Sequence, residues 1–455
     1  MSMSFTTLIV LAVDTLATSG DITMTWTSPM FSKLSSNDSS VNPLPRPITN
    51  QEGALIGSLL NIGAMLGVVP FSFISERFGR KKALLTIGVF HVIAYGTMAF
   101  ARRVWLFYFG RLFGGLAVGG GYTILPMYIA EISEESKRGY HSMTLTVFWA
   151  IGNFLPYLVG PFASVRSFNL INAAFPTCFL LVFSLIGKES PFYLVGAGRL
   201  DEAEKVLVTV RSADPIEAED ELKRIRASIE KEKETPPTLR NVVANPGIRK
   251  SFVIAFGLVS FQQFSGWNAI TFYLQPIFDG SGIDLPSYLS SMIVGASILV
   301  FSLPAPFLAH KFGRKTLLAA SAGSMAVCLA VLGAFFTLKD RVKADVSGAS
   351  WVPVAFLVVL VLGFESGLAC LPWTISAEIF PKNVKKWSAS GTCAVTYFTS
   401  FLMTQFFDDM RRGLGTDGTF FFYAGFSALC VVFTVVYVPE TRGKTFVEIQ
   451  ELLRR

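Results

Sequence analysis

The sequence predicts an all-α membrane protein with twelve transmembrane helices, arranged as two six-helix repeats with a helical linker between them. Three observations carry this prediction. Of the 455 residues, 51% are hydrophobic and only 16% are charged, whereas a soluble protein carries about a quarter charged residues. Apolar runs long enough to cross a bilayer recur along the whole chain. Short charged motifs recur in the same order in its two halves.

The predicted spans follow from length, because a helix needs roughly 20 mostly apolar residues to cross a bilayer. They are expected near 5–28, 53–74, 84–101, 104–127, 143–162, 166–186, 251–278, 286–309, 316–336, 352–377, 387–408 and 419–438. The polar stretch between the sixth and seventh contains LDEAEKVLVTV and EAEDELKRIRASIEKEKE, which are charged and helically periodic. The expected organisation is an N-terminal half at 1–187, a cytosolic helical linker at 188–250, a C-terminal half at 251–438 and a cytosolic tail at 439–455.

An internal repeat supports the two halves. RFGRKK at 77–82 recurs as KFGRKT at 311–316, YIAEISEESKRG has a weaker echo in ISAEIFPKNVKK, and KESP is echoed by PETR. Parallel repeats of six helices are typical of transporters that work by alternating access. The basic loops favour cytosolic N- and C-termini. That orientation places the loop 30–52 outside, where Asn37 lies in a glycosylation acceptor pattern.

Composition and motifs exclude several other classes of protein. The net charge of +7 is small and scattered, which does not indicate a nucleic-acid partner, and the five cysteines lie in apolar runs without metal-ligand spacing. The glycine run at 114–121 follows no strand and favours close helix packing over phosphate binding. No nucleophile–base pair or nucleotide loop is recognisable. We therefore expect no enzyme and no cofactor, but a monomer that contacts membrane lipid and a small-molecule solute.

The stretch SFQQFSGWNAITFY at 260–273 places amide and hydroxyl side chains inside an apolar helix. Gln262, Ser265 and Asn268 recur every three residues, which gives a slanted stripe on one side of the helix. An unpaired amide in hydrocarbon is costly, so this stripe is expected to face a wet cavity. Amides offer both donors and acceptors, which suits a ligand with many hydroxyls. The alternative is a set of polar contacts between neighbouring helices.

Five motifs together resemble the sugar porter branch of the major facilitator superfamily over essentially the full chain. They are GRLFGGLAVGGGYTILPMYIAEIS, ESKRG, QQFSGWNAITFY, LPWTISAEIFP and VPETRGKTFVEIQ. TWTSP at 25–29 resembles the first-helix signature of the arthropod branch, which includes trehalose and glucose transporters. The resemblance implies the major facilitator fold. It also implies facilitative transport of a hexose, or of a disaccharide such as trehalose, across the plasma membrane.

The resemblance also implies a substrate site. Gln262, Gln263 and Asn268 would hold the sugar, and Trp373 would offer a flat apolar face to its ring. Pro372 interrupts the tenth span, and Glu365 is an intramembrane carboxylate able to bond a substrate hydroxyl, a backbone amide or a proton. The expected substrate-binding residues are Gln262, Gln263, Asn268, Trp373, Glu365, Thr146, Phe272, Tyr273, Ile298, Thr396 and Tyr397.

Several positions depart from the family pattern. Thr146 stands where the family carries a sugar-binding Gln, and Ile298 stands where it carries an Asn. Thr396 and Tyr397 replace an Asn-Trp pair. Fewer hydrogen bonds to hydroxyls favour weaker or different sugar selectivity.

Charged motifs at the predicted cytosolic helix ends resemble the family's gating ion pairs, which tie these ends together when that side is closed. The expected gating residues are Arg77, Arg80, Glu131, Arg138, Glu189, Arg314, Glu378, Lys385 and Glu440. The alternative is solvated charge that only sets topology. Lys385 replaces the family's usual Arg and loses its bidentate geometry. Arg111 matches an Arg that the family has in the fourth span.

Three alternatives to a facilitative sugar carrier stay open at this point. The first is a transporter-like sensor that binds sugar and moves little of it. The second is a carrier of a less hydroxylated solute, such as a polyol or an aglycone. The third is a proton-coupled symporter, because Asp14 and Asp21 lie on one face of the first span. Proton-coupled relatives carry their carboxylate just after the position of Trp26, where this chain has Thr27, so uniport is expected.

Overall fold

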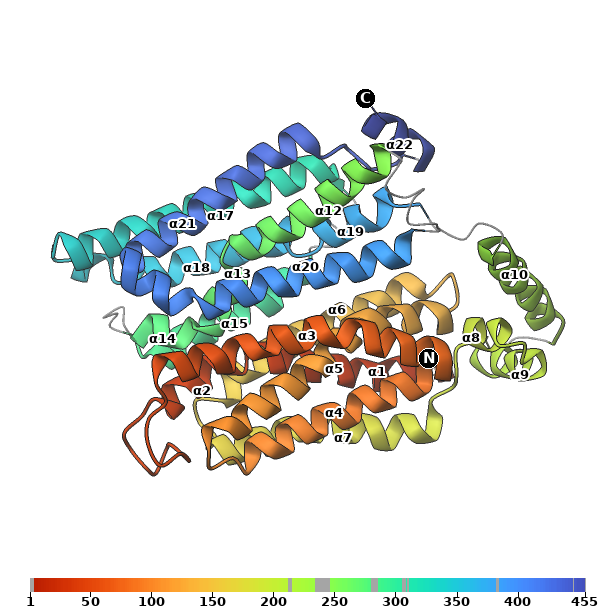
Figure 1. Cartoon of the computed structure of the whole chain (residues 1–455), viewed down its shortest axis with the longest axis horizontal. Helices are drawn as coiled ribbons and strands as arrows, with labels where there is room; N and C mark the ends of the chain where they lie inside the picture. The colour runs from red at the N-terminus through yellow and green to blue at the C-terminus, as the bar shows by residue number, and fades with distance from the viewer. Residues whose placement is uncertain are drawn as a thin grey trace. The chain divides into compact units, whose positions relative to one another are not determined.

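The computed structural model describes residues 4–211, 215–233, 246–279, 285–304, 308, 311–381, 384–444 and 446–454. These residues form helices joined by short connections (Figure 1). The helices before the chain's centre are α1 Phe5–Thr25, α2 Thr27–Leu34, α3 Asn50–Phe78, α4 Arg80–Ala99, α5 Val104–Ile132, α6 Arg138–Val159 and α7 Val165–Ile186. The predicted linker contains α8 Pro191–Gly196, α9 Leu200–Arg211 and α10 Pro215–Lys233.

The second part of the chain has more interrupted helices. They are α12 Pro246–Phe264, α13 Trp267–Phe272, α14 Leu274–Asp279, α15 Ser287–Ser302, α17 Arg314–Phe336, α18 Val352–Gly363, α19 Leu371–Ile379, α20 Lys385–Gln405, α21 Phe407–Tyr437 and α22 Phe446–Arg454. The π-helical turns η1 Thr337–Arg341 and η3 Phe364–Leu368 and the 3-10 turn η2 Ser347–Ala349 connect them.

Within the described ranges, nine helical stretches are long and apolar enough to cross a membrane. They correspond to predicted spans one to six, nine, ten and twelve. The seventh predicted span begins earlier than expected, at Pro246, and is divided into α12, α13 and α14. The eighth is the shorter apolar helix α15; residues 305–307 and 309 at the C-terminal end of this predicted span lie outside the described residues. The eleventh is α20, which has 21 residues but carries many hydroxyl side chains.

The chain divides into two compact units by its contacts. Unit 1 comprises Met1–Met24, Ile62–Gly152 and Ala163–Pro236. Within it, α4 packs against both α5 and α7, around a core that includes Tyr128 and Phe183. A smaller apolar core joins α8, α9 and α10.

Unit 2 comprises Thr25–Asn61, Asn153–Phe162 and Pro237–Arg455. It therefore combines two segments from the first half of the sequence with helices from the second. Tyr157 donates to the carbonyl of Thr271 at 2.8 Å, and the ring of Phe31 lies 5.2 Å from that of Tyr273. We call the segments 25–61 and 153–162, with the helices of unit 2 that they contact, the interlocked end.

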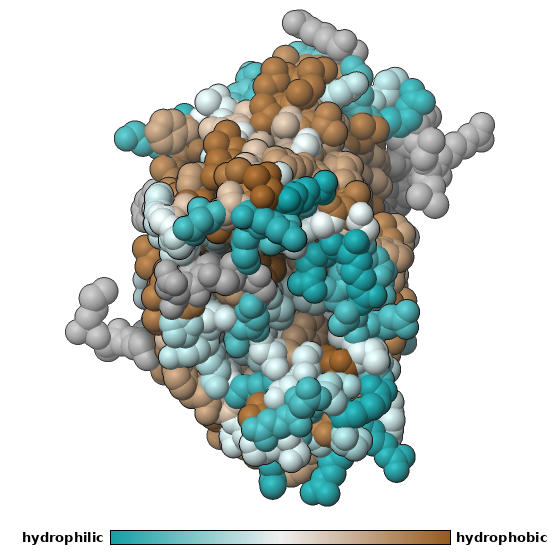
Figure 2. Space-filling model, turned by 90° about the vertical axis from the view of Figure 1, so that its left-hand side faces the viewer, coloured by the Kyte–Doolittle hydropathy of each residue, from teal (hydrophilic) through white to brown (hydrophobic). Residues whose placement is uncertain are grey.

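Side-chain hydropathy follows the helix direction. Figure 2 shows hydrophilic residues gathered over one end of the helices and hydrophobic residues along the flanks. Many large apolar side chains of the spans are exposed, among them Leu185 of α7, Val327 of α17 and Val436 of α21. Exposed apolar side chains on long helices are what a protein requires when its helices contact lipid.

Candidate functional site

The polar stretch of the seventh span lies at a break in that helix. Gly266 separates α12 from α13 and has φ +81°, a left-handed conformation that glycine adopts without steric cost. The ring of Tyr423 lies where a Cβ at this position would be. A side chain here would therefore meet both backbone strain and a packed ring, which explains the glycine in QQFSGWN.

Gln262 connects this break to the tenth span. In an α-helix the carbonyl of residue i accepts from the N–H of residue i+4. The residue four places after Leu368 is Pro372, which has no N–H. Gln262 replaces that donor: its side-chain nitrogen donates to the Leu368 carbonyl at 2.7 Å and to the Ala369 carbonyl at 3.1 Å. The side chain is 4% exposed, so the amide satisfies a carbonyl that would otherwise be buried and unpaired.

A row of amide and hydroxyl groups continues from this point. The side-chain nitrogen of Gln263 lies 3.4 Å from the Gln262 oxygen. Asn268 donates to the Gln263 oxygen at 2.7 Å and to the Ser400 hydroxyl at 2.8 Å. Ser400 in turn donates to the Asn61 side-chain oxygen at 3.0 Å. The row links α12, α13, α20 and α3, and it places exchangeable donors and acceptors inside the bundle of unit 2.

Aromatic and acidic side chains of the tenth span lie near this row. Trp267 stacks on Phe364 with ring centroids 3.8 Å apart. Glu365 lies on the π-helical turn η3, half-buried. Trp373 directly follows Pro372 in α19 and is 36% exposed. Part of its side chain is therefore accessible, which an aromatic platform for a sugar ring requires.

The remaining predicted binding residues of unit 2 divide into three groups. Thr396 and Tyr397 are buried on α20, which packs on α12 and α13. Ile298 is buried on α15, which packs on η3. Phe272 and Tyr273 are also buried, and Tyr273 stacks on Phe407 at 4.7 Å.

Thr146 belongs to unit 1, on α6. Its hydroxyl donates to the Ser142 carbonyl of its own helix at 3.2 Å. The structure thus brings Gln262, Gln263 and Asn268 together by hydrogen bonds, whereas Thr146 lies in a different unit and uses its hydroxyl locally.

A second candidate site is the charged cluster at the start of α4. Arg80 forms a bidentate ion pair with Glu131, with both N–O distances 3.0 Å, and the Ser190 hydroxyl also donates to Glu131. Glu189 accepts from the backbone N–H of Arg80 at 2.7 Å. Burial raises the pKa of Glu189 above its usual value, and the surrounding N–H donors only partly oppose this effect.

The corresponding cluster in the second half has the same design. Arg314 at the start of α17 pairs with Glu378 at 3.1 Å, which also accepts from the Thr441 hydroxyl. Glu440 accepts from the backbone N–H of Arg314 at 2.9 Å. Burial alone raises the pKa of Glu440, but its three backbone N–H donors and the Arg314 charge together hold that pKa below its usual value.

These two clusters show the internal repeat in three dimensions. In each, a Gly-Arg pair begins a helix and a glutamate after the last span of that half receives the first N–H groups of the helix. A Cβ on Gly79 would collide with the Glu189 carboxylate, and a Cβ on Gly313 with that of Glu440. A carboxylate at a helix N-terminus is favourable because it meets unpaired N–H groups and the positive end of the helix dipole.

The other predicted gating residues differ in their surroundings. Arg77 and Arg138 are exposed, and we find no ion pair for either side chain within the described ranges. Lys385 begins α20, but its side chain lies outside the described residues. Arg111 is fully buried on α5 and donates to the carbonyl of Thr23, so it fastens the fourth span to the first.

Sequence reasoning missed Ser400, Asn61 and the Leu368 carbonyl. Ser400 and Asn61 are polar residues in apolar spans, which is a recognised signal for a buried functional position. That the Leu368 carbonyl lacks a helical donor could be deduced from Pro372. Its actual donor, Gln262, could not, because it lies over a hundred residues away in the chain.

Solved structures with this fold are transporters. The inward-open xylose transporter XylE from E. coli matches with a TM-score of 0.80 at 22% identity, covering 98% of this chain and 99% of that one. The POT family transporter PepTSo matches with a TM-score of 0.65 at 12% identity, covering 94% of this chain and 97% of that one. These likenesses confirm the predicted twelve-helix major facilitator architecture.

Curated relatives include insect proteins. The facilitated trehalose transporter Tret1 of Aedes aegypti is 31% identical over 404 residues, which cover 89% of this chain and 50% of that protein. The Tret1 of Polypedilum vanderplanki is also 31% identical over 404 residues, which cover 89% and 80%. The chain thus spans about half the length of some relatives and about four-fifths of others. Residues 7–453 match the model of the family described as sugar (and other) transporter, and this chain is a member of that membrane-transport family.

Proposed function

We propose that this protein is a facilitative carrier that moves a sugar, a hexose or a disaccharide such as trehalose, across the plasma membrane by alternating access. No bond is made or broken in this process. The observation that carries the proposal is the row of Gln262, Gln263, Asn268 and Ser400 at a helix break. Each of these groups is hydrogen-bonded to a neighbouring side chain. A sugar hydroxyl can both donate and accept, so it can take the place of one partner in such a bond without leaving the other buried group unpaired.

In the proposed mechanism, residues 1–187 and 251–438 are the two halves that move, with the linker and both termini in the cytosol. The interlocked end supports this mechanism, because single hydrogen bonds there join segments of the first half to helices of the second. Examples are the Tyr157 hydrogen bond to Thr271 and the Ser28 hydroxyl that accepts from the backbone N–H of Gln275 at 3.0 Å. Small sets of such contacts can form in one state and break in another at modest free energy. Exposed Asn37 lies on this side and is the proposed glycosylation site.

One observation favours a second candidate, a carrier of a less hydroxylated solute such as a polyol or an aglycone. Ile298 and Thr146 replace amides of the family pattern. Ile298 is 3% exposed and offers no hydrogen bond, and the Thr146 hydroxyl is bonded within its own helix. A pocket with fewer donors discriminates less between hydroxyl patterns.

Uptake into liposomes containing the purified full chain tests both candidates. Labelled trehalose, glucose and inositol should be compared with a labelled monohydroxylated aglycone. We expect at least one sugar to equilibrate faster than into empty liposomes, and Asn268→Ala to weaken its binding by roughly 1–3 kcal/mol. Thr271→Val is the matched control, because the Thr271 hydroxyl bonds only to carbonyls of its own helix. Uptake of inositol or of the aglycone, without uptake of either sugar, would establish the second candidate. A folded protein that passes none of these solutes would overturn both.

A further inference from the structure

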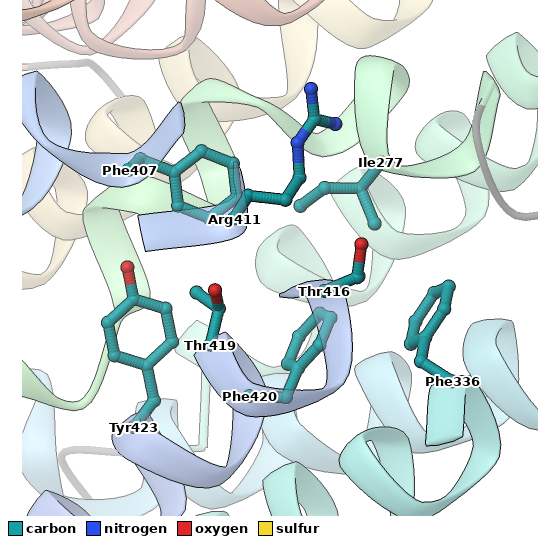
Figure 3. Close-up of a pocket in the computed structure, with 8 residues that line it drawn as sticks. All are labelled: Ile277, Phe336, Phe407, Arg411, Thr416, Thr419, Phe420 and Tyr423. Atoms are coloured by element: carbon teal, nitrogen blue, oxygen red, sulfur yellow. The ribbon is translucent and has the colours of Figure 1, made fainter. Parts of the chain in front are cut away.

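A kink in α21 at Gly415 leaves a small pocket within unit 2. Figure 3 shows side chains of α14, α17 and both runs of α21 around this space. Its volume is about 30 Å³, which has room for one or two water molecules but not for a sugar or an aromatic ring. A chemically reactive group that the proposed transport does not use lies instead on the surface of the predicted linker.

This group is the hydroxyl of Ser228 on α10. Ser228 ends the sequence KRIRAS, in which Lys223, Arg224 and Arg226 stand five, four and two places before it. The side chains of all four residues are exposed. We find no hydrogen bond from the Ser228 hydroxyl to another residue within the described ranges. An exposed hydroxyl that follows a basic run is accessible to an enzyme that recognises positive charge.

The basic run could simply be a solvated helix face, and its ion pairs decide how available it is. Lys223 pairs with Glu219, and Arg226 pairs with Glu230, each at 3.0 Å. All four of these side chains are more than half exposed, so each pair contributes little free energy and exchanges readily for another partner. Protein kinases select substrates by such charge patterns. Carboxylates of a kinase could therefore replace Glu219 and Glu230.

The end of α10 can leave the helix at small cost, which matters because a kinase takes its substrate as an extended segment. The buried side chains that hold α10 to α8 and α9 are Ala218 and Ile225, and both precede Ser228. From 226 to 230 only Ile229 is even partly buried. Segments with few buried contacts open locally at low free energy.

The first part of α10 stays attached while its end opens. Glu221 pairs with Arg211 of α9 at 2.9 Å, and the Arg211 side chain is only 6% exposed. Arg211 also donates to the carbonyl of Ile132 at the end of α5. These contacts fasten the linker to unit 1 upstream of Ser228, so modification of Ser228 does not require the linker to detach.

Arg224 is placed to hold a phosphate on Ser228. Residues four apart lie on the same face of a helix, and we find no ion pair for Arg224 in the part of α10 that the structure describes. A phosphoserine carries a charge of about −2 and three acceptor oxygens, which a guanidinium binds in bidentate geometry. Lys231 and Glu232 follow Ser228 by three and four places, and their opposite charges offset each other.

We propose that Ser228 is phosphorylated by a serine kinase that recognises Lys223, Arg224 and Arg226, and that Arg224 then pairs with the phosphate. The Ser228 oxygen forms a bond to the γ-phosphorus of ATP, the bond from that phosphorus to the bridging oxygen breaks, and ADP leaves. The hydroxyl proton passes to the catalytic aspartate of the kinase. The site rests on the proposed cytosolic position of the linker and not on the identity of the transported solute.

Phosphorylation of the purified full chain in detergent tests the site. The catalytic subunit of cAMP-dependent protein kinase and protein kinase C are used separately with magnesium ATP, and each phosphate is located by mass spectrometry of peptides. With at least one of them, we expect Ser228 to be phosphorylated about tenfold faster than Thr209. Both ends of the protein are accessible in detergent, so the result depends on neither transport nor orientation.

Thr209 is the matched control hydroxyl. It is exposed on α9, but the three residues before it are apolar, and its neighbours Leu207 and Val210 are buried. Its segment therefore lacks the charge pattern and cannot leave its helix cheaply.

Protein variants test the recognition. Replacing both arginines, Arg224→Gln with Arg226→Gln, should lower the initial rate at Ser228 about tenfold, because the kinase loses two charge contacts. Arg199→Gln with Lys205→Gln is the control, because it removes the same charge from exposed positions of the linker before Ser228. All four substitutions are on the surface, so the variants should keep the melting temperature of wild type.

Phosphorus NMR tests the partner of the phosphate. In protein phosphorylated to completion, the phosphate should take up its last proton at a pH about 0.3 lower in wild type than in Arg224→Gln. Lys223→Gln removes the same charge from a different helix face and should cause a smaller change.

The outcomes separate the two parts of the proposal. A rate at Ser228 no higher than that at Thr209 with both kinases would overturn the site. Equal rate losses in the arginine variant and in its control would overturn the recognition by Arg224 and Arg226. Identical phosphate titrations of wild type and Arg224→Gln would overturn the pairing with Arg224. None of these results bears on the proposed sugar transport, which the liposome assay decides.

Discussion

The side-chain amide of Gln262 donates to the carbonyl oxygen of Leu368 at 2.7 Å, and Leu368 is the residue whose carbonyl Pro372 leaves without a helical donor. The first glutamine of QQFSGWN thus completes the backbone hydrogen bonding of LPW, a motif over a hundred residues away. The two motifs form one structural unit. A substitution in one motif should therefore change how much the other motif contributes to the free energy of unfolding.

A double-mutant cycle tests this coupling. Gln262→Ala strands the Leu368 carbonyl and should lower the free energy of unfolding by roughly 1–3 kcal/mol. Pro372→Ala restores an N–H at residue 372, which can take the Leu368 carbonyl. In that background Gln262→Ala should cost about 1 kcal/mol less. The measurement is unfolding of the four purified proteins in detergent.

A second cycle with Ser265→Ala in place of Gln262→Ala is the control. The Ser265 hydroxyl donates to the Gln262 backbone carbonyl and not to α19, so its effect should add to that of Pro372→Ala. Additivity of the Gln262 cycle within about 0.5 kcal/mol would contradict the coupling.

The sequence predicted the spans well because their signal is local. Length and hydropathy alone identified predicted spans one to six, nine, ten and twelve, since each is decided by its own residues. The division of the seventh span at Gly266 and Tyr273 was not predicted. It depends on Tyr423 and Phe407, which come from a helix far away in the sequence.

The candidate site was predictable only in part, for a similar reason. An amide in an apolar helix indicates that a polar partner exists, but not which one. Gln262, Gln263 and Asn268 could be selected from the sequence, whereas the Ser400–Asn61 contact and the Leu368 carbonyl required the fold. The charged repeats identified Arg80 and Arg314. Their equivalence as helix starts capped by Glu189 and Glu440 became visible only in three dimensions.

Neutralising Glu131 should change the population of transport states if the proposed gating role is correct. Glu131→Gln weakens the pair with Arg80, whose side chain is 15% exposed. We expect a shift of about 1 kcal/mol toward the form that is open at the charged end, which is about a fivefold change in its population ratio. Cysteine accessibility measured from each side of the membrane would report this shift.

Glu134→Gln is the matched control for this gating variant. Glu134 lies three residues after Glu131, just past the end of α5, and pairs with Lys137, but both side chains are about half exposed, so this pair should contribute little. Identical labelling of the Glu131→Gln and Glu134→Gln proteins would exclude the gating role of Glu131.

The two capping glutamates should respond to pH with opposite signs. The pKa of Glu440 is lowered in the folded protein, so its charge stabilises the fold above its ordinary pKa, and this stabilisation is lost as pH falls. The pKa of Glu189 is raised, so the folded state holds the proton more tightly and stability declines as pH rises through this range. Melting temperatures of wild type, Glu440→Gln and Glu189→Gln should be compared between about pH 4 and pH 7.

The difference in melting temperature between wild type and a variant isolates the contribution of one glutamate from those of the other carboxylates. The melting temperature of wild type should increase relative to that of Glu440→Gln as pH rises. It should decrease relative to that of Glu189→Gln over the same interval. Parallel curves for the two variants would show that the clusters are electrostatically equivalent, contrary to their different burial.

Three acids, two in unit 1 and one in unit 2, are the candidates for coupling transport to protons. Asp21 of α1 accepts from the Tyr122 hydroxyl at 2.8 Å. Asp14 lies on the same helix and is 0% exposed. Glu365 lies half-buried on the π-helical turn before Pro372. Each is a carboxylate inside a membrane span, which makes it a candidate proton carrier.

Uniport is nevertheless the expected mode, because Thr27 occupies the position after Trp26 where proton-coupled relatives carry their carboxylate. An uncoupled carrier only equilibrates its substrate, so an imposed pH gradient should leave the final internal concentration unchanged. A symporter with one proton per sugar would instead accumulate substrate about tenfold per pH unit, since each unit corresponds to about 1.4 kcal/mol per proton. Uptake into liposomes with and without an inward proton gradient separates these cases. Accumulation above equilibrium that disappears in Asp21→Asn, Asp14→Asn or Glu365→Gln would refute uniport, and the variant in which it disappears would identify the proton carrier.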